Sequence, residues 1–394
     1  ARDVIHNGLD FPTTRDERWK YTRISSIIDA EYTRNEGGIK NIDAFKIGDK
    51  SWRYLVFVNG VYRSNLSDQM PTGISMQSIS AVSEKEKQAM LENLGRLANF
   101  KKQAFESLNT AYFEDGTFLE VGKNAEIEAP ICILNLSDGK AQVSNPRNLI
   151  HVALGAKVSF VHHFVGHLNE GGFTNSVVEI IADENSDAHF YLVQDEGIDS
   201  ATVTATYVRQ KKDSRFSMTT ITKSGRLVRN NIHAAIAGEG CETNMFGLYF
   251  TDGSQHVDNQ TYADHQQPNC NSNELYKGVM SDRSTGVFNG KIMVNRAAQK
   301  TNAFQSNQNI LLSDKATINT KPELEIYADD VRCSHGCTVG QLDEEAMFYL
   351  QSRGLGKEAA HRLLVQAFAT DVIEKIEIEA LRENVEQFIE QKFQ

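Results

Sequence analysis

Two cysteines and a histidine lie within five residues near the end of the chain, in the stretch CSHGC at 333–337. Residues two apart in a β-strand project from one face, so Cys333, His335 and Cys337 would share a side; in a helix His335 would point away from the cysteines. We favour a strand, because the preceding residues LEIYADDV alternate like an edge strand and two nearby glycines oppose a helix.

Three kinds of chemistry fit this trio. Thiolate and imidazole are ligands for zinc, iron and iron–sulfur clusters, although a closed zinc site needs a fourth ligand and no second CxxC or HxxxH lies nearby. A catalytic thiol beside an imidazole is the second interpretation, without any oxyanion-hole signature or orienting Asn or Asp. In the third, the cysteines pack as small apolar groups and His335 caps the sheet. The residues alone leave all three open.

His162, His163 and His167 form a second cluster. Strand alternation would place His163 and His167 on one face and His162 on the other, so two of them could bind one metal. No carboxylate or cysteine falls at matching spacing. This favours ordinary strand histidines over a metal site.

A polar run at 256–278 contains Asp258, Asp264, His265 and Cys270. Such a run could line a carbohydrate or calcium site on a solenoid, with Asp258 and Asp264 as the acids of a carbohydrate-active enzyme. Polar ladders that merely stack between coils have the same appearance in sequence. The chain has no Walker A loop, dinucleotide fingerprint, GxSxG or HExxH motif.

Composition narrows the class of protein. The 394 residues carry a formal net charge of -11, which argues against nucleic acid as a partner. The longest apolar runs, such as YLVFV at 54–58, fall far short of the ~20 residues that span a bilayer. No secretory leader is visible, and the five cysteines are odd in number and mostly scattered. We therefore expect a soluble protein in a reducing, cytoplasmic compartment, away from membranes.

The elements that must position these residues divide the chain in three. Residues 1–116 are expected to form an α/β segment, with a capping box TRDE at 14–17 that predicts a helix, a hairpin around Asn59-Gly60, and a helical pattern over 84–110. Residues 117–338 alternate like strands with hardly a helix signal. Residues 339–394 are expected to be helical.

The middle region repeats. Large apolar residues recur at intervals of 30, 26, 30 and 29 residues, at Phe160, Phe190, Phe216, Phe246 and Leu275. One coil of a wide β-solenoid needs such an interval, because each coil buries its inner face only when a neighbour stacks on it. A β-sandwich, whose strands also recur, is the alternative.

The last region has the pattern of an amphipathic helix, with apolar residues at helical spacing at Ala360, Leu363, Leu364, Ala367 and Phe368. From residue 371 to the end, seven acidic residues face three basic ones. Most acidic faces are simply solvated, but a helical appendage with an apolar stripe could also dock a partner.

Four stretches of the chain resemble the SufB/SufD family of the SUF iron–sulfur cluster assembly system. They are PTTRDERWKYT at 12–22, FVNGVY at 57–62, LNTAYFEDGTFLEV at 108–121, and the long, highly specific run from YKGVMSDRS to FYLQSRG at 276–354. SufB-like chains carry a cysteine in the strand where this chain reads QSNQNILL, and an EHE variant in place of CSHG. The resemblance is therefore to the SufD branch.

The resemblance implies a fold and partners. The fold would be a right-handed parallel β-helix between an N-terminal α/β segment and a C-terminal helical domain. The function would be that of a non-enzymatic scaffold subunit, which pairs with SufB through the β-helix and docks the ABC-type ATPase SufC on its C-terminal helices. Without SufB, the same edge could pair with a copy of itself. The isolated chain would hold no cofactor or metal, and an Fe–S cluster would form transiently in the complex with SufB.

The resemblance also orders the residues of the opening motif. It implies that His335 is the main functional residue, as a ligand or proton handler at a nascent cluster, and that Cys333 ranks second. Cys337 stands where the family usually has a small residue, so we favour a structural role for it, with an extra ligand as the alternative. A β-helix carbohydrate-active enzyme remains the competing function.

Overall fold

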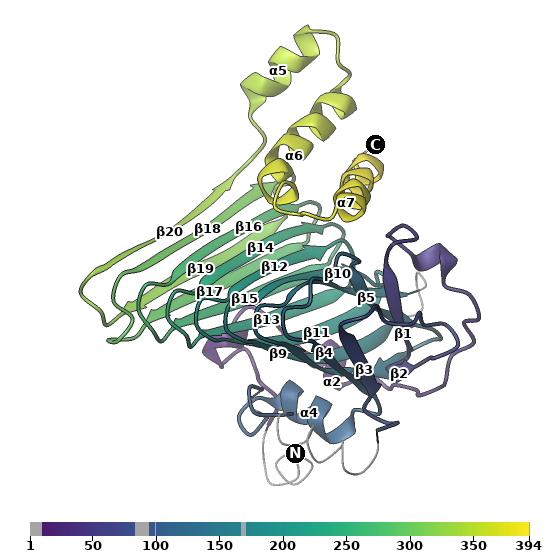
Figure 1. The fold of residues 1–394 in the computed structure, drawn as a ribbon. Helices are drawn as coiled ribbons and strands as arrows, with labels where there is room; N and C mark the ends of the chain where they lie inside the picture. The colour runs from purple at the N-terminus through teal and green to yellow at the C-terminus, as the bar shows by residue number, and fades with distance from the viewer. Residues whose placement is uncertain (1–9, 83–93, 99, 167–170, 394) are drawn as a thin grey trace.

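The chain winds as a parallel β-solenoid in which each coil gives one strand to each of two facing sheets (Figure 1). The computed structural model describes residues 10–82, 94–98, 100–166 and 171–393. The alternation of successive strands between two parallel sheets confirms the predicted β-solenoid rather than the β-sandwich. The first sheet contains, in spatial order, β2 (Val61–Tyr62), β1 (Arg53–Val58), β5 (Ile131–Ser137), β8 (Lys157–Gly166), β10 (Asp187–Asp195), β12 (Arg215–Thr222), β14 (Glu242–Thr251), β16 (Asn271–Met280), β18 (Thr301–Leu311) and β20 (Val331–Gly340).

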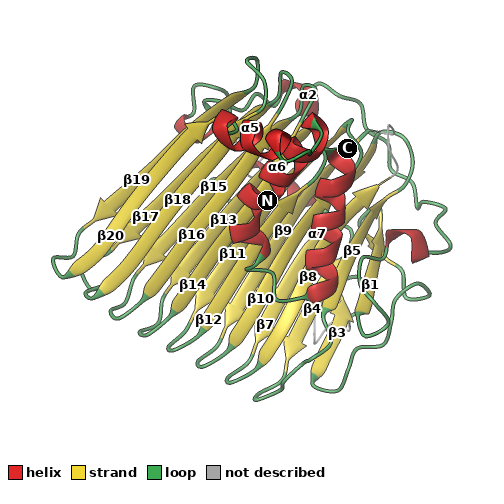
Figure 2. Ribbon diagram, turned by 90° about the horizontal axis from the view of Figure 1, so that it is seen from above, coloured by secondary structure: helices red, strands yellow, loops and turns green. Residues whose placement is uncertain are grey.

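The second sheet lies against the first, and Figure 2 shows the strands running side by side. Its strands, in spatial order, are β19 (Thr317–Ile326), β17 (Thr285–Val294), β15 (His256–His265), β13 (Leu227–Ile236), β11 (Ser200–Gln210), β9 (Gly172–Ala182), β7 (Arg147–Val152), β4 (Gly116–Val121) and β3 (Ile74–Ser78), with β6 (Gln142–Ser144) also paired to β9. Phenylalanine, methionine and aliphatic side chains from both sheets fill the space between them.

The register of the coils corrects the predicted repeat. Phe160 pairs with Phe190 as expected, but Phe190 then pairs with Met218, and Phe216 lies two residues earlier on the strand. Phe246 lies on the outer face, where it packs among the residues beneath the C-terminal helices. The period was right, but loops of unequal length shift the strands by two or three residues, which a fixed spacing does not follow.

One turn of each coil uses a left-handed backbone residue at the same place. The column consists of Asn124 (φ 57), Gly155 (φ 69), Asn185 (φ 57), Asp213 (φ 56), Gly240 (φ 72), Asn269 (φ 61) and Lys300 (φ 57). Glycine, asparagine and aspartate tolerate this conformation best, so these residues define where each strand pair begins.

The two ends of the solenoid differ. At the first end, β1 pairs in parallel with β5, and β2 returns antiparallel to β1 through the predicted Asn59-Gly60 turn, in which both residues have positive φ. In the other sheet, β3 runs antiparallel to β4. At the far end, β20 and β19 each have one partner strand among the described residues. The far end is therefore an open edge.

The N-terminal segment packs on both sheets. Its 3-10 helix η1 (Glu17–Trp19) and its helices α2 (Ser25–Ile28) and α4 (Ala104–Tyr112) cover the outer face of the second sheet. The 3-10 helix η2 (Asp43–Phe45) packs with Trp52 and Tyr54 on the outer face of the first sheet. The helix predicted from the capping box is only the short η1, because the Glu17 carboxylate pairs with Lys321 of β19 at 2.5 Å and no side chain caps the turn. Of the helix predicted over 84–110, residues 84–93 and 99 lie outside the described residues, and only α4 is helical.

The C-terminal helices are α5 (Glu344–Ser352), α6 (Lys357–Ile373) and α7 (Glu379–Lys392). They lie on the opposite side of the solenoid from α4, and α5 projects away from the sheets (Figure 1). Lys277 of β16 anchors α6 by donating to the Phe368 carbonyl at 2.9 Å and pairing with Asp371 at 2.5 Å. The predicted α6 is confirmed, but its buried face is centred on Val365 and Ala369, which leaves Leu363 exposed.

Candidate functional site

Cys333, His335 and Cys337 lie on β20, the last strand of the first sheet, as the spacing predicted. They are directly opposite Ala303, Gln305 and Asn307 of β18, whose side chains are buried inside the solenoid. The trio therefore shares the inner face of β20 at the open end. Cys333 is half-buried against the solenoid core, whereas His335 and Cys337 are exposed.

Within the described part of the chain, no three His, Cys, Asp or Glu side chains lie close enough together to hold a metal ion. Burial raises the pKa of the Cys333 thiol, so this sulfur is protonated at neutral pH and is not an activated nucleophile in this arrangement. The trio thus consists of separate donors along one strand, of which His335 and Cys337 are exposed and Cys333 is half-buried.

A polar pair lies behind His335 inside the solenoid. Gln305 stands opposite His335, and its Nε2 donates to Oε2 of Glu274 on the next strand at 2.6 Å. Burial raises the pKa of Glu274 to about 7. Oε1 of each residue is buried without a hydrogen-bond partner. Room for Gln305 comes from Gly290 on the facing sheet, where an added Cβ would lie 2.3 Å from Gln305 Nε2.

The same row is apolar elsewhere in the solenoid. Moving away from the open end, the residues in register with Glu274 are Met245, Met218, Phe190 and Phe160. The interior therefore changes from hydrocarbon to polar groups in its last coils, directly beneath His335. Burying an uncompensated carboxyl group is unfavourable, so this change marks the open end as a candidate site.

Exposed apolar side chains surround the open end. Val339 of β20 is 48% exposed, and Ile326 and Tyr327 at the end of β19 are 40% and 59% exposed. An unpaired strand edge with such side chains is a surface on which another strand can add.

The remaining predicted clusters are not brought together. His162 and His163 lie on opposite faces of β8, both buried, and burial lowers the pKa of each to about 3. His167 lies outside the described residues. The two rings are therefore neutral core groups, and His162 packs against Phe164 and Phe190.

The carboxylates proposed for a carbohydrate enzyme are far apart. Asp258 and Asp264 are six residues apart on β15, roughly 20 Å at the rise of a strand, whereas a glycosidase pair lies within about 10 Å. Asp258 pairs with Arg229, and Asp264 accepts from Asn295 at 2.8 Å. His265 points to the inside and bonds Ser272 at 2.8 Å. This arrangement does not support glycoside hydrolysis.

Comparison with family models gives a match along almost the whole chain. Residues 134–368 match the SufBD core domain of SUF system FeS cluster assembly, and residues 5–133 match the SufBD protein N-terminal region. The chain belongs to the SufBD family. This confirms the resemblance drawn from the sequence motifs and assigns the chain to iron–sulfur cluster assembly by the SUF system.

This SufBD family member is similar to proteins from distant organisms. An iron–sulfur cluster assembly SufBD family protein of Synechocystis is 31% identical over 99% of this chain and 89% of its own length. The iron–sulfur cluster assembly protein SufD of Escherichia coli is 29% identical over 98% of this chain and 89% of its own length. A protein named chloroplastic from Arabidopsis thaliana is 30% identical over 95% and 81% of the two chains.

Two features of this SufBD family member were not predicted from the sequence motifs. One is the Glu274–Gln305 pair, which becomes visible only when the register of three coils is known. The other is a pocket on the outer face of the second sheet, where the N-terminal segment covers strands β11 to β19.

No described helix is long and apolar enough to cross a membrane. All five cysteines are free.

Proposed function

We propose that this chain is a non-enzymatic scaffold subunit that pairs with SufB through the open end of its solenoid. The observation that carries the proposal is the free edge of β20, which presents Cys333, His335 and Cys337 beside exposed apolar side chains. Strand addition at this edge would cover the unpaired backbone and bring a second chain's donors next to His335. The Fe–S cluster is then the product assembled between two chains.

The roles that we propose within the trio follow the family resemblance, and exposure supports the first of them. His335 is exposed and free to bind iron or carry a proton, so we propose it as the main group. Cys333 comes second, because its thiol is half-buried and burial raises its pKa. The thiol must become exposed and lose its proton before it can bind iron. Cys337 is exposed but has no stated family role, and we retain it as a local variation with an extra ligand as the alternative.

We also propose that the C-terminal helices dock the ATPase SufC. In support, α5 has no buried residue and exposes Phe348 and Tyr349 at 72% and 56%. Apolar side chains exposed on a projecting helix suit a helix-docking partner. We place the protein in the cytoplasm. We keep the division into 1–116, 117–338 and 339–394 as part of the proposal, and limited proteolysis of the full chain tests it.

The test is cluster reconstitution on the chain copurified with SufB and SufC. We expect His335→Ala to lower the cluster yield at least tenfold while leaving complex formation intact. Ser334→Ala, which changes the adjacent side chain on the other face of β20, is the matched control and should give the wild-type yield. An undiminished yield with His335→Ala contradicts the role of this residue, and loss only with Cys337→Ala reverses the ranking.

A further inference from the structure

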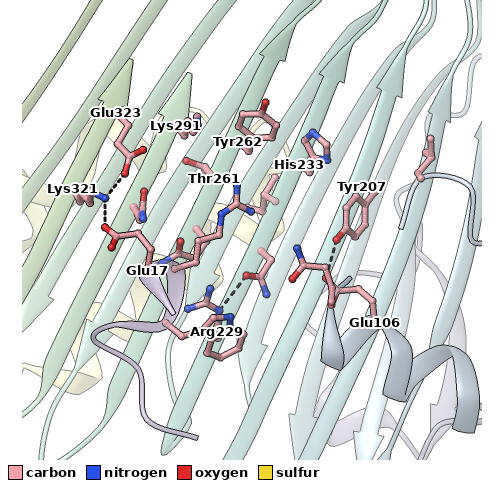
Figure 3. A pocket seen from close by; sticks show the side chains of 18 residues that line it. Glu17, Glu106, Tyr207, Arg229, His233, Thr261, Tyr262, Lys291, Lys321 and Glu323 are labelled. Atoms are coloured by element: carbon pink, nitrogen blue, oxygen red, sulfur yellow. Dashed lines mark hydrogen bonds and ion pairs between the residues drawn. The ribbon is translucent and has the colours of Figure 1, made fainter. Parts of the chain in front are cut away.

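A pocket of about 520 Å³ lies on the outer face of the second sheet (Figure 3). Its floor is the sheet from β11 to β19, and its walls are η1 and the start of α4. The volume is typical of small-molecule sites. Cys333, His335 and Cys337 lie on β20 in the other sheet, so the pocket does not include them, although its floor reaches β19 at the open end.

The floor presents a row of aromatic rings. Tyr207, His233, Tyr262 and Lys291 are in register on four neighbouring strands and stand side by side in Figure 3. The rings of His233 and Tyr262 stack at 4.7 Å, and Tyr207 meets His233 edge-on at 5.7 Å. Such a row offers ring faces and edges to a flat ligand.

Among the described residues, most charged side chains of the pocket have an ion-pair partner, and the exceptions are Arg18 and Glu106, whose carboxyl group accepts a hydrogen bond from Tyr207. Lys321 bridges Glu17 at 2.5 Å and Glu323 at 2.6 Å, and Lys291 pairs with Glu325 at 2.6 Å. Arg18 has no ion pair among the described residues, and its guanidinium carbon lies 6.0 Å from the centre of the Tyr262 ring. Arg18 is therefore the cation available to an anionic group, directly beside the aromatic row.

Two residues that line the pocket, His233 and Thr261, have a buried polar side-chain atom without a hydrogen-bond partner. Nε2 of His233 is buried without a hydrogen bond, and burial lowers the pKa of this ring, so it is neutral and can donate or accept. Tyr207 already donates to Glu106 at 2.8 Å. The His233 nitrogen would gain a bond only from a group that enters the pocket.

Two of the four amide side chains that line the pocket already make hydrogen bonds. Gln260 donates to Asp258 at 2.7 Å, and Asn231 both donates to the Thr204 carbonyl at 3.1 Å and accepts from Arg229 at 3.1 Å. The amides of Gln103 and Asn289 have no hydrogen bond among the described residues, and they remain available beside the stacked rings and the unpaired cation.

We propose that this pocket binds a small planar aromatic anion, with its ring against Tyr262 and His233 and its anionic group at Arg18. A phosphate or carboxylate group would meet the guanidinium, and a ring substituent would reach Nε2 of His233. The site does not include the residues proposed for cluster assembly and adds a ligand-binding function to the chain.

Trp19 provides a built-in reporter for the test. It lines the pocket and packs on Phe105 and on Arg229, whose guanidinium carbon is 3.6 Å from the ring centre. The chain has one other tryptophan, Trp52, which packs on Tyr54 in a different cluster. A Trp52→Phe background isolates the fluorescence of Trp19. Calorimetric titration of the unmodified full chain guards against an effect of that substitution.

The probe is phenyl phosphate, titrated against the full chain, with inorganic phosphate and phenol in separate arms. We expect saturable binding with a dissociation constant of about 1 mM or below, and binding at least tenfold weaker for phosphate or phenol alone. No saturation with phenyl phosphate overturns the proposal. Equal binding of inorganic phosphate alone also overturns it, because the ring would then contribute nothing.

Two variants locate the binding. Arg18→Ala should weaken phenyl phosphate binding at least tenfold, and Tyr262→Leu should remove the preference for phenyl phosphate over phosphate. Arg15→Ala, an exposed arginine of the same segment that does not line the pocket, is the matched control and should bind normally. Equal weakening by Arg15→Ala and Arg18→Ala would indicate general charge attraction and contradict the assigned site.

Discussion

At the scale of single residues, the buried Glu274 near the open end should make the free energy of unfolding depend on pH. Its pKa, raised from 4.5 to about 7 by burial, means that the folded chain keeps a proton that the unfolded chain loses. The free energy of unfolding should therefore fall as pH rises from 4.5 to 7, by about 3 kcal/mol for this group. Glu274→Gln should remove this slope, as measured by denaturant unfolding across that range.

Met245→Leu is the matched control for Glu274→Gln. Met245 lies next to Glu274 in the same inner row and carries no titrating group. The Met245→Leu substitution should therefore change the free energy of unfolding by a similar amount at every pH. If Glu274→Gln keeps the wild-type slope, the carboxyl is not buried in solution as it is here.

His162 acts with the opposite sign. Burial lowers its pKa from 6.5 to about 3, so the unfolded chain binds a proton that the folded chain refuses. Stability should fall as pH drops below 6.5, by about 2 kcal/mol per histidine by pH 5. His162→Leu should reduce this loss in acid unfolding, whereas Phe164→Leu, on the same face of β8, should not. Equal acid sensitivity of the two variants would contradict a buried neutral His162.

The sequence predicted part of the candidate site. The shared face of Cys333, His335 and Cys337 follows from the period of a strand, which needs no knowledge of other coils. The Glu274–Gln305 pair needs the register of β16 and β18, and unequal loops between coils hide that register. Ordinary spacing rules therefore find groups on one strand and miss groups that meet across strands.

At the scale of elements, β20 is the part most open to change. Strand addition predicts that the isolated chain self-associates through this edge. Val339→Lys should shift it toward monomer by at least tenfold in the dissociation constant, because a charge would be buried at the contact. Sedimentation of the purified chain measures this shift.

Phe304→Lys is the control for the edge. Phe304 is as exposed as Val339, at 47% against 48%, but lies one strand inside the edge on the outer face of β18. Its replacement should leave the association unchanged. A wild-type chain that stays monomeric at high concentration would show that the edge does not pair with itself.

Helix α5 gives a second prediction at this scale. Phe348→Asp should abolish copurification of SufC while leaving the SufB pairing intact, because the exposed apolar face of α5 would gain a charge. Leu363→Asp, at an exposed apolar position on α6, is the control and should retain SufC. Loss of SufC with both variants would place the contact on a broader surface than α5.

Elements were predictable where local signals and tertiary contacts agree. The Asn59-Gly60 hairpin and α6 follow from turn chemistry and helical spacing, and packing does not oppose either. The helix expected at the capping box fails because Glu17 reaches β19 instead of its own backbone. The buried face of α6 depends on the sheet beneath it, so Leu363 could not be assigned to its exposed side from sequence.

At the scale of the whole molecule, a solenoid should open from its free end. Each coil is stabilised mainly by its neighbours, and the last coil has a neighbour on one side only. Backbone amides of β19 and β20 should exchange hydrogen faster than those of β11 and β13 in the isolated chain. Hydrogen exchange measures this, with β1 and β5 at the capped end as the control. Equal protection of β20 and β13 would show that something covers the edge.

The difference between the two ends also limits the number of partners that the molecule can bind through its sheet edges. The terminal strands β2 and β3 are antiparallel to their neighbours and only two and five residues long, whereas β19 and β20 each present a ten-residue edge for a parallel strand. A subunit with two free ends could polymerise into a fibre, whereas a subunit with one free end can bind only one neighbour. We therefore expect growth through the β19 and β20 edge to stop at a pair, whether the second member is a copy or a relative, because the first end carries the short β1–β2 hairpin instead of a long parallel edge.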